Sequence, residues 1–118
     1  MSKPKQIQPE QLLAHKGTSV DKILTSKDAI IYSLGIGFSK DPMNVDELKY
    51  TYELHDDFSV FPTISTASLI NLFDVLSEAP GLPEFNPMML LHGEQRVEFY
   101  DKLEVDTEYT TFPRVVDV

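Results

Sequence analysis

The chain has 118 residues, which is enough for one small domain, and its hydrophobic fraction of 42% is ordinary for a soluble protein. Its 10 basic and 19 acidic residues give a net charge of −9, which argues against nucleic acid and anionic lipid as partners. There is no cysteine, so disulfides and thiolate chemistry are excluded, and no apolar run approaches the roughly 20 residues needed to span a bilayer.

The N-terminal stretch is polar and is interrupted by proline and glycine. A single helical turn is predicted over Gln11–Ala14. We therefore divide the chain into a flexible N-terminal arm, residues 1–24, which orders only against something else, and a folded domain, residues 25–118.

The first firm element is a helix that begins near Thr25. Thr25 can cap the first turn, and Asp28 stands three residues later, which is the spacing of a capping box. The helix is predicted to end at Gly35 and Gly37, where a left-handed backbone is tolerated. Its apolar face is expected to consist of Ile30, Ile31 and Leu34.

Polar and apolar residues alternate over Leu48–Glu53, which predicts a half-buried strand. A helix follows, which Ser65 or Thr66 caps and Pro80-Gly81 stops. Its apolar positions have helical spacing and are Leu69, Leu72, Phe73 and Leu76.

The last part of the chain predicts a short apolar helix over Met88–Gly93 and a strand over Glu94–Tyr100. A polar turn at Asp101–Asp106 leads into a second long strand, Thr107–Val118, which Pro113 interrupts. A sheet that stops there leaves an unpaired edge and an uncovered apolar face, so something else must complete it.

Four segments carry a resemblance to a known family, in the same order and at about the same spacing. They are Ile31–Gly37, Glu47–Glu53, Phe58–Thr63 and Pro80–Gln95, the last of which contains Leu-His-Gly-Glu-Gln. Over about Ser26 to Val118 the chain resembles the N-terminal half-domain of MaoC-like, (R)-specific (type 2) enoyl-CoA hydratases, which occur as a module of the peroxisomal multifunctional enzyme type 2.

The resemblance implies an α+β fold, an incomplete hot-dog in which an antiparallel sheet wraps around a central helix and the last strands are missing. A C-terminal hot-dog half, a partner chain or a tight oligomer or complex is expected to complete the sheet. The resemblance also implies reversible hydration of trans-2-enoyl-CoA to (R)-3-hydroxyacyl-CoA in fatty-acid β-oxidation. The CoA thioester is then the substrate, no other cofactor is needed, and the compartment is the peroxisome.

The family's catalytic pair comes from an Asp-x-Asn-x-x-His motif, and that motif does not occur in this sequence. Asp41-Pro42-Met43-Asn44 has the wrong spacing and no following histidine. We therefore predict no catalytic residue here: the chain alone should be inactive and should hold the fatty-acyl part of the substrate. The alternative is an inactive, hydratase-like accessory or structural subunit of a larger assembly, for which the mitochondrion is an alternative location.

The predicted substrate-binding residues are His92, Gly93, Gln95, Met88, Met89 and Phe61. His92 could orient the thioester or a water, or it could cap backbone carbonyls at a helix end or pack internally. Gly93 allows close approach of the backbone, and Gln95 could bond across a half-domain interface or satisfy local amides. The two methionines and the phenylalanine could line an acyl channel or pack in the core.

The cluster His55-Asp56-Asp57 has metal-ligand chemistry but lacks a spaced second set of histidines or carboxylates on a regular element. We predict a solvated loop there and no metal site. The pair Gly35 and Gly37 lacks the third glycine of a dinucleotide fingerprint and closes a helix instead of opening one.

Overall fold

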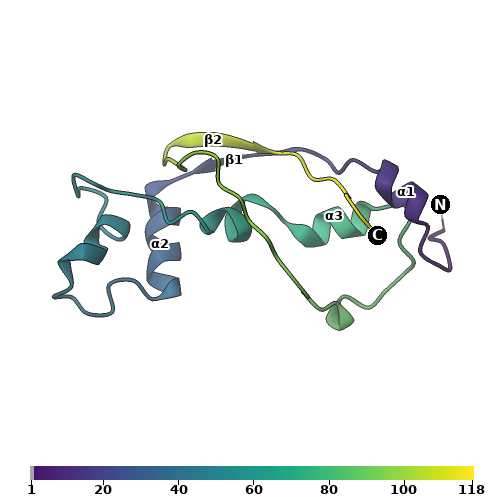
Figure 1. Ribbon diagram of the computed structural model, residues 1–118, viewed down its shortest axis with the longest axis horizontal. Coiled ribbons are helices and arrows are strands. Elements are labelled where there is room, and N and C mark those ends of the chain that lie inside the picture. Colours follow the sequence, from purple (N-terminus) through teal and green to yellow (C-terminus); the bar gives the residue numbers. More distant parts are fainter. Residues whose placement is uncertain (1) are drawn as a thin grey trace. The chain divides into compact units, whose positions relative to one another are not determined.

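The computed structural model describes residues 2–118 and shows a small α+β protein (Figure 1). Its helices and strands are α1 (Pro9–Ala14), β1 (Val20–Leu24), α2 (Ser26–Ile36), α3 (Leu72–Glu78) and β2 (Thr107–Thr111). Three short helical turns complete the list: η1 (Val45–Tyr50), η2 (Ser65–Leu69) and η3 (Pro87–Met89).

The strands β1 and β2 form a two-stranded antiparallel ribbon. At one end the Thr111 hydroxyl donates to the carbonyl of Val20, and at the other the Asp106 amide donates to the carbonyl of Leu24. Asp106 has a φ of 55°, a left-handed conformation that aspartate tolerates better than most residues. The ribbon confirms the start of the predicted C-terminal strand, which ends at Thr111, shortly before Pro113.

The chain forms two compact units, and each has its own small core. The first unit contains the described residues up to Val20 together with Ile70–Val97 and Thr111–Val118, and its core is Leu12 and Ala79. The second unit contains Asp21–Leu69 and Glu98–Thr110. Its buried residues are Leu24, Ala29, Ser33, Ile64 and Leu69.

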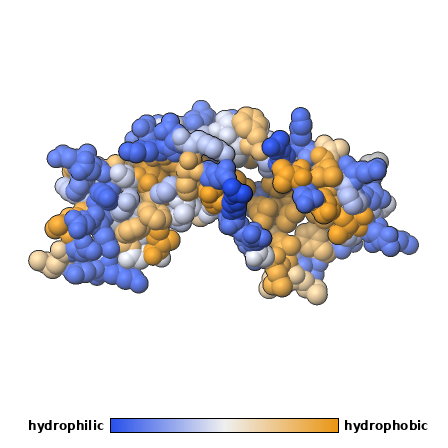
Figure 2. All heavy atoms as spheres, in the orientation of Figure 1, coloured by the Kyte–Doolittle hydropathy of each residue, from blue (hydrophilic) through white to orange (hydrophobic). Residues whose placement is uncertain are grey.

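Large hydrophobic side chains remain exposed in both units, and Figure 2 shows them gathered at the surface around α1 and α3. Soluble proteins that function alone rarely expose extended apolar surface, because its contact with water is unfavourable. The small cores and the exposed apolar residues together leave apolar surface available for contact with a partner.

Helix α2 begins with the capping box that the sequence predicts. The Thr25 hydroxyl accepts from the Asp28 amide, and the Asp28 carboxylate accepts from both the amide and the hydroxyl of Thr25. The helix ends at Gly37, whose φ of 109° is left-handed, as predicted. Gly35 lies inside the helix, so its prediction as a stop is wrong.

The predicted apolar face of α2 is not its buried face. Ala29 and Ser33 are buried, whereas Ile31 and Leu34 are exposed. Small side chains therefore face the unit's own core, and the bulkier branched ones face outward. Tyr32 is fixed from this helix by a 2.7 Å hydrogen bond between its hydroxyl and that of Thr63.

The capping box makes stability depend on pH. Hydrogen bonds from the hydroxyl and then the amide of Thr25 lower the pKa of Asp28, while partial burial opposes them. Because the folded pKa is depressed, the contribution is present at neutral pH and is lost as pH falls below about 4. We expect Asp28→Ala to cost about 1 kcal/mol in urea unfolding at pH 7, and almost nothing in acid. A loss that is the same at both pH values would contradict this account.

The predicted strand over residues 48–53 is wrong. Residues Val45–Tyr50 form a 3₁₀ helix instead, because the Asn44 side chain accepts from the Asp46 amide and starts the turn. Tyr50 then joins an aromatic cluster in which its ring centroid lies 4.6 Å from that of Phe38 and 5.6 Å from that of Phe61. The alternation of polar and apolar residues over 48–53 therefore coincides with a 3₁₀ helix and a turn, and not with a strand.

The single helix predicted to follow Ser65 or Thr66 is also wrong. The hydroxyls of these residues bond backward to the carbonyls of Pro62 and Thr63, so they do not cap a helix. The helix α3 starts later, where the Asn71 side chain accepts from the Phe73 amide. It ends at Glu78, ahead of Pro80, as expected.

Two further predictions in the second half of the chain differ from the described structure. The apolar helix over 88–93 is reduced to the short turn η3, and residues 94–100 form no strand. Pro87 begins the turn. Leu90 already has an extended backbone conformation, so the helix stops there. The segment predicted as an N-terminal arm, residues 1–24, carries α1 and β1, and the domain boundary after it stays a prediction.

Candidate functional site

The first unit contains an apolar groove with a volume of about 260 Å³. It is lined by Ile7, Leu76, Leu82, Pro83, Phe85, Asn86, Met89 and Leu90. Three parts of the unit supply these residues: the segment before α1, the helix α3, and the loop that follows α3 (Figure 1). Asn86 is the only polar side chain among them, so the groove offers apolar contact and no acid or base.

The N-terminal wall of the groove is held by Gly81. The Gln8 amide donates to the Gly81 carbonyl at 2.9 Å, and Leu12, on the helix that follows, is buried. A Cβ at Gly81 would lie 2.6 Å from the Gln8 carbonyl oxygen and 2.8 Å from the Leu12 Cγ. Only glycine permits this approach, which brings Ile7 to the groove.

We expect Gly81→Ala to lower the free energy of unfolding by about 2 kcal/mol, because the added methyl group must displace backbone and a buried leucine. Urea unfolding followed by circular dichroism measures the loss. Gly93→Ala is the matched control, since nothing lies within 4 Å of a Cβ there. An equal effect of the two substitutions would show that the N-terminal segment does not dock on Gly81.

The opposite wall is shaped by the turn η3. The Asn86 side chain accepts from the Met88 amide at 3.0 Å, and the Asn86 carbonyl accepts from the Met89 amide at 2.9 Å. The turn brings Met89 and Leu90 to the groove, while Met88 is 89% exposed and lies outside it. A methionine at this wall can adapt to ligands of different shape.

The structure brings only one of the predicted binding residues into the groove, namely Met89. His92, Gly93 and Gln95 follow η3 along the chain, and all three are exposed. Their roles in binding stay predictions. Phe61 lies in the second unit, in the aromatic cluster with Phe38 and Tyr50.

Most groove residues were not identified from the sequence. Ile7 lies in the segment that the sequence predicts as an arm, and Leu82 and Phe85 belong to a proline-rich loop without periodicity. Leu76 was recognised only as an apolar position of a helix. The signal that could have found them is Pro80-Gly81, because a glycine between a helix and an apolar loop marks a close backbone approach.

Charged groups near the groove are few. The Lys3 ammonium lies 5.9 Å from the centroid of the Phe85 ring, within range of a cation–π contact.

The predicted loop at residues 55–57 is a turn in which the His55 Nδ1 accepts from the Asp57 amide. Among residues 2–118, no three His, Asp or Glu side chains gather as metal ligands would, and no helix has the length and apolarity to cross a bilayer.

The size of the groove limits what it can hold. An apolar cavity of about 150 Å³ is enough for benzene, whereas pockets for whole drug-sized ligands start near ~300 Å³. A groove of about 260 Å³ therefore fits part of a ligand, such as a stretch of hydrocarbon chain. A bulky polar group would lose its hydration there without gaining partners.

The comparisons with known proteins agree with the resemblance seen in the sequence. Residues 23–118 match the family described as MFE-2 hydratase 2 N-terminal domain. The chain is 33% identical over 110 residues to a probable enoyl-CoA hydratase 2 of Dictyostelium discoideum, which covers 92% of this chain and 36% of that protein. It is 41% identical over 97 residues to the peroxisomal enoyl-CoA hydratase 2 of Arabidopsis thaliana, covering 78% of this chain and 30% of that one.

A third relative is the peroxisomal multifunctional enzyme type 2 of Mus musculus, with 36% identity over 110 residues. The match covers 90% of this chain and 14% of the mouse protein. The chain thus spans between 14% and 36% of the length of these three relatives. These matches confirm the resemblance on which the sequence interpretation rests.

Proposed function

Because the chain belongs to the family of MFE-2 hydratase 2 N-terminal domains, we propose that it is the acyl-chain-binding part of an enoyl-CoA hydratase. The whole enzyme reversibly hydrates trans-2-enoyl-CoA to (R)-3-hydroxyacyl-CoA in fatty-acid β-oxidation. The observation that carries the proposal is the apolar groove, which has the chemistry and the size for a hydrocarbon chain.

The chemistry of hydration explains what this chain contributes and what it leaves to others. Water adds its oxygen to C3 and a proton to C2, and the thioester oxygen carries enolate charge between the two steps. The groove can bind the chain beyond C3, fix its orientation and keep water away from it. The Asp-x-Asn-x-x-His motif is absent from these residues, so the proton transfers are assigned to groups outside them.

We further propose that the two-stranded ribbon belongs to an incomplete hot-dog sheet, the fold implied by the family. A two-stranded ribbon is marginally stable by itself, and its outer edges invite pairing with further strands. Exposed apolar residues such as Val97 and Val116 supply surface that a neighbouring half-domain or chain can cover. This partner completes both the sheet and the active site.

The names of the relatives support one compartment. Several of them have names that place them in peroxisomes, including proteins of Arabidopsis thaliana and Mus musculus and a hydratase-dehydrogenase-epimerase of Saccharomyces cerevisiae. We propose the peroxisome for this protein as well. A mitochondrial assembly, the alternative drawn from the sequence, has no support among these relatives.

The proposal is tested by adding trans-2-decenoyl-CoA to the purified native protein and following the loss of the conjugated enoyl absorbance. The expected product is 3-hydroxydecanoyl-CoA of (R) configuration, identified by chiral chromatography. The reverse reaction from the (R) thioester should restore the absorbance, while the (S) thioester should not react. Absence of turnover in both directions would contradict the enzyme proposal and favour an accessory subunit.

A further inference from the structure

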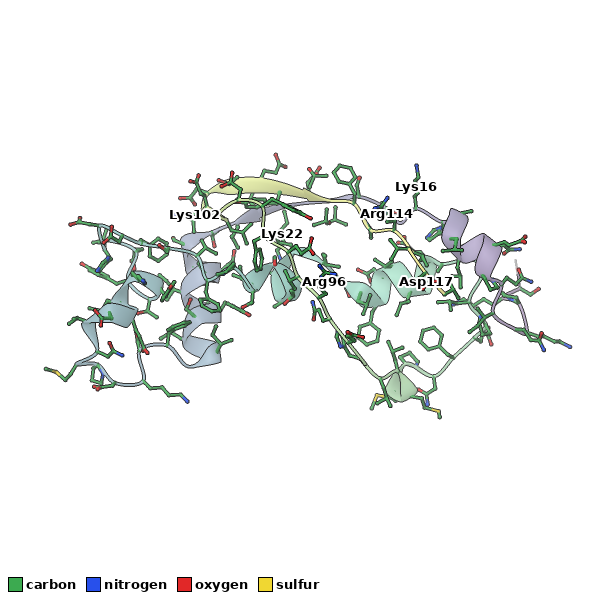
Figure 3. The ribbon with its side chains drawn as sticks, in the orientation of Figure 1. Lys16, Lys22, Arg96, Lys102, Arg114 and Asp117 are labelled. Atoms are coloured by element: carbon green, nitrogen blue, oxygen red, sulfur yellow. The ribbon has the colours of Figure 1, made fainter. Side chains whose placement is uncertain are left out.

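A second hollow of the first unit, with a volume of about 380 Å³, has a different chemistry from the groove. We call it the basic pocket. It is lined by Lys16, Gly17, Ser19, Phe112, Pro113 and Arg114. These residues come from the segment before β1 and the segment after β2, which run antiparallel and meet in a bridge between Lys16 and Arg114 (Figure 3).

A glycine fixes the register of these two segments. The Gly17 amide donates to the Pro113 carbonyl at 3.1 Å. A Cβ at Gly17 would lie 2.8 Å from the Pro113 Cγ, so the two backbones approach as closely as they do because residue 17 has no side chain. The register sets Lys16 directly opposite Arg114.

Two like charges placed opposite each other on a ladder are unfavourable. The chain has 10 basic and 19 acidic residues, so carboxylates to neutralise them are abundant. Within residues 2–118, however, neither Lys16 nor Arg114 has a side-chain hydrogen bond or ion pair. Asp117, the carboxylate nearest to Arg114 in the sequence, accepts from the Val118 amide. Glu78 accepts from the hydroxyl of Thr18, two residues after Lys16.

The remaining lining adds an aromatic face and a hydroxyl. The Phe112 ring is 78% exposed at the edge of the pocket, and Ser19 supplies a hydrogen-bonding group. A guanidinium and an ammonium bind phosphate through charge-assisted hydrogen bonds, and an exposed ring stacks on a nucleobase. Two cations beside such a ring therefore match a phosphorylated nucleotide better than a free carboxylate or a lipid.

We propose that the basic pocket binds the nucleotide end of the CoA thioester, with Lys16 and Arg114 on its phosphates and Phe112 against adenine. The proposal rests on the proposed function, because that function supplies the ligand. It accounts for how a chain of net charge −9 accepts an anionic substrate: the two cations create a local positive field within an acidic protein. The pocket positions the substrate and takes no part in proton transfer.

The test is a calorimetric titration of the native protein with adenosine 3′-phosphate 5′-diphosphate, which is the nucleotide end of CoA, and separately with inorganic phosphate. The double variant Lys16→Glu/Arg114→Glu should weaken nucleotide binding by about tenfold or more, because each lost hydrogen bond to a charged group contributes substantially to the binding free energy. Phe112→Leu should weaken it by about fivefold through lost stacking. Lys102→Glu, which reverses one charge at an exposed lysine outside the pocket, should bind the nucleotide within about twofold of the parent protein.

Unchanged nucleotide affinity in the double variant, with an unchanged melting temperature, would overturn the proposal. Inorganic phosphate binding as tightly as the nucleotide would overturn it too, because it would indicate a nonspecific anion site. A misfolded double variant is replaced by Lys16→Gln, for which a weaker effect in the same direction is expected.

Kinetics with two substrates separate this proposal from the proposed function. For crotonyl-CoA the double variant should raise KM, and for crotonyl-pantetheine, which lacks the nucleotide, it should leave KM unchanged. Equal kinetics of variant and parent on both substrates would contradict the proposal for the basic pocket and leave the proposed hydratase function intact. If the parent protein hydrated neither substrate, the proposed hydratase function would be contradicted. The nucleotide titration alone would then test whether the basic pocket binds the nucleotide.

Discussion

Leu24→Ala is expected to lower the free energy of unfolding by about 3 kcal/mol. Leu24 is the last residue of β1 and is fully buried, with 0% of its side chain accessible. Its carbonyl accepts from the Asp106 amide, and α2 begins two residues later, so the side chain packs where the ribbon and the helix meet. Truncation leaves a cavity that the rigid ribbon end cannot close.

Ile23→Ala is the matched control, because Ile23 precedes Leu24 on the same strand and is 57% exposed. It should cost less than about 1 kcal/mol, mostly through lower strand propensity. Urea unfolding measured at the same pH compares the two variants. If Ile23→Ala were the more damaging substitution, the ribbon would have the opposite register, since a shift by one residue exchanges the two faces of a strand.

The second large effect is expected on catalysis by the native enzyme. Leu76→Trp places an indole in the apolar groove, where it occupies space that the acyl chain needs. We expect kcat/KM for trans-2-decenoyl-CoA to fall by about fiftyfold, because small changes in an apolar pocket are worth factors of this size. The four-carbon substrate crotonyl-CoA does not need the groove and should be hydrated at an unchanged rate.

Leu72→Trp is the control for this substitution. Leu72 lies one turn earlier on α3, is exposed, and does not line the groove. It should leave kcat/KM for both substrates within about twofold of the parent protein. Loss of activity on the four-carbon and ten-carbon substrates alike in Leu76→Trp would show damage to the fold and would count against the groove as the acyl site.

Local signals made some elements predictable from the sequence. The pair Thr25 and Asp28 predicts the start of α2 because all the atoms of its capping box lie within one turn. Gly37 predicts its end through backbone conformation alone. The Thr and Tyr residues likewise predict the C-terminal strand, and Pro113 predicts where its pairing is interrupted.

Elements whose outcome depends on competing turns were not predictable in the same way. Alternation over residues 48–53 is what a strand requires, but Asn44 offers a side-chain acceptor that begins a helical turn just before it. Asn71 acts similarly, because its side chain caps α3, which therefore begins after Asn71 and not at Ser65 as predicted. Apolar spacing alone does not tell which neighbour covers a helix face. It therefore did not reveal that Ile31 and Leu34 of α2 are exposed.

The groove combines a local and a distant component. Met89 belongs to an apolar block that the sequence marks as a channel lining or as core. Ile7 reaches the same groove only because the Gln8 amide bonds to the Gly81 carbonyl, a contact between segments far apart in the chain. No periodicity encodes such a contact, and the close approach at Gly81 is its only trace in the sequence.

The central claim is that the acyl end of the substrate lies in the groove, and photo-crosslinking tests it most directly. The native protein is irradiated with a ten-carbon trans-2-enoyl-CoA that carries a diazirine at the end of its chain, and the labelled residues are found by mass spectrometry. We expect labels on Ile7 and within residues 82–90, and we expect excess trans-2-decenoyl-CoA to remove them. Labelling confined to other parts of the protein, and abolished by the same competitor, would place the acyl chain elsewhere and contradict the account.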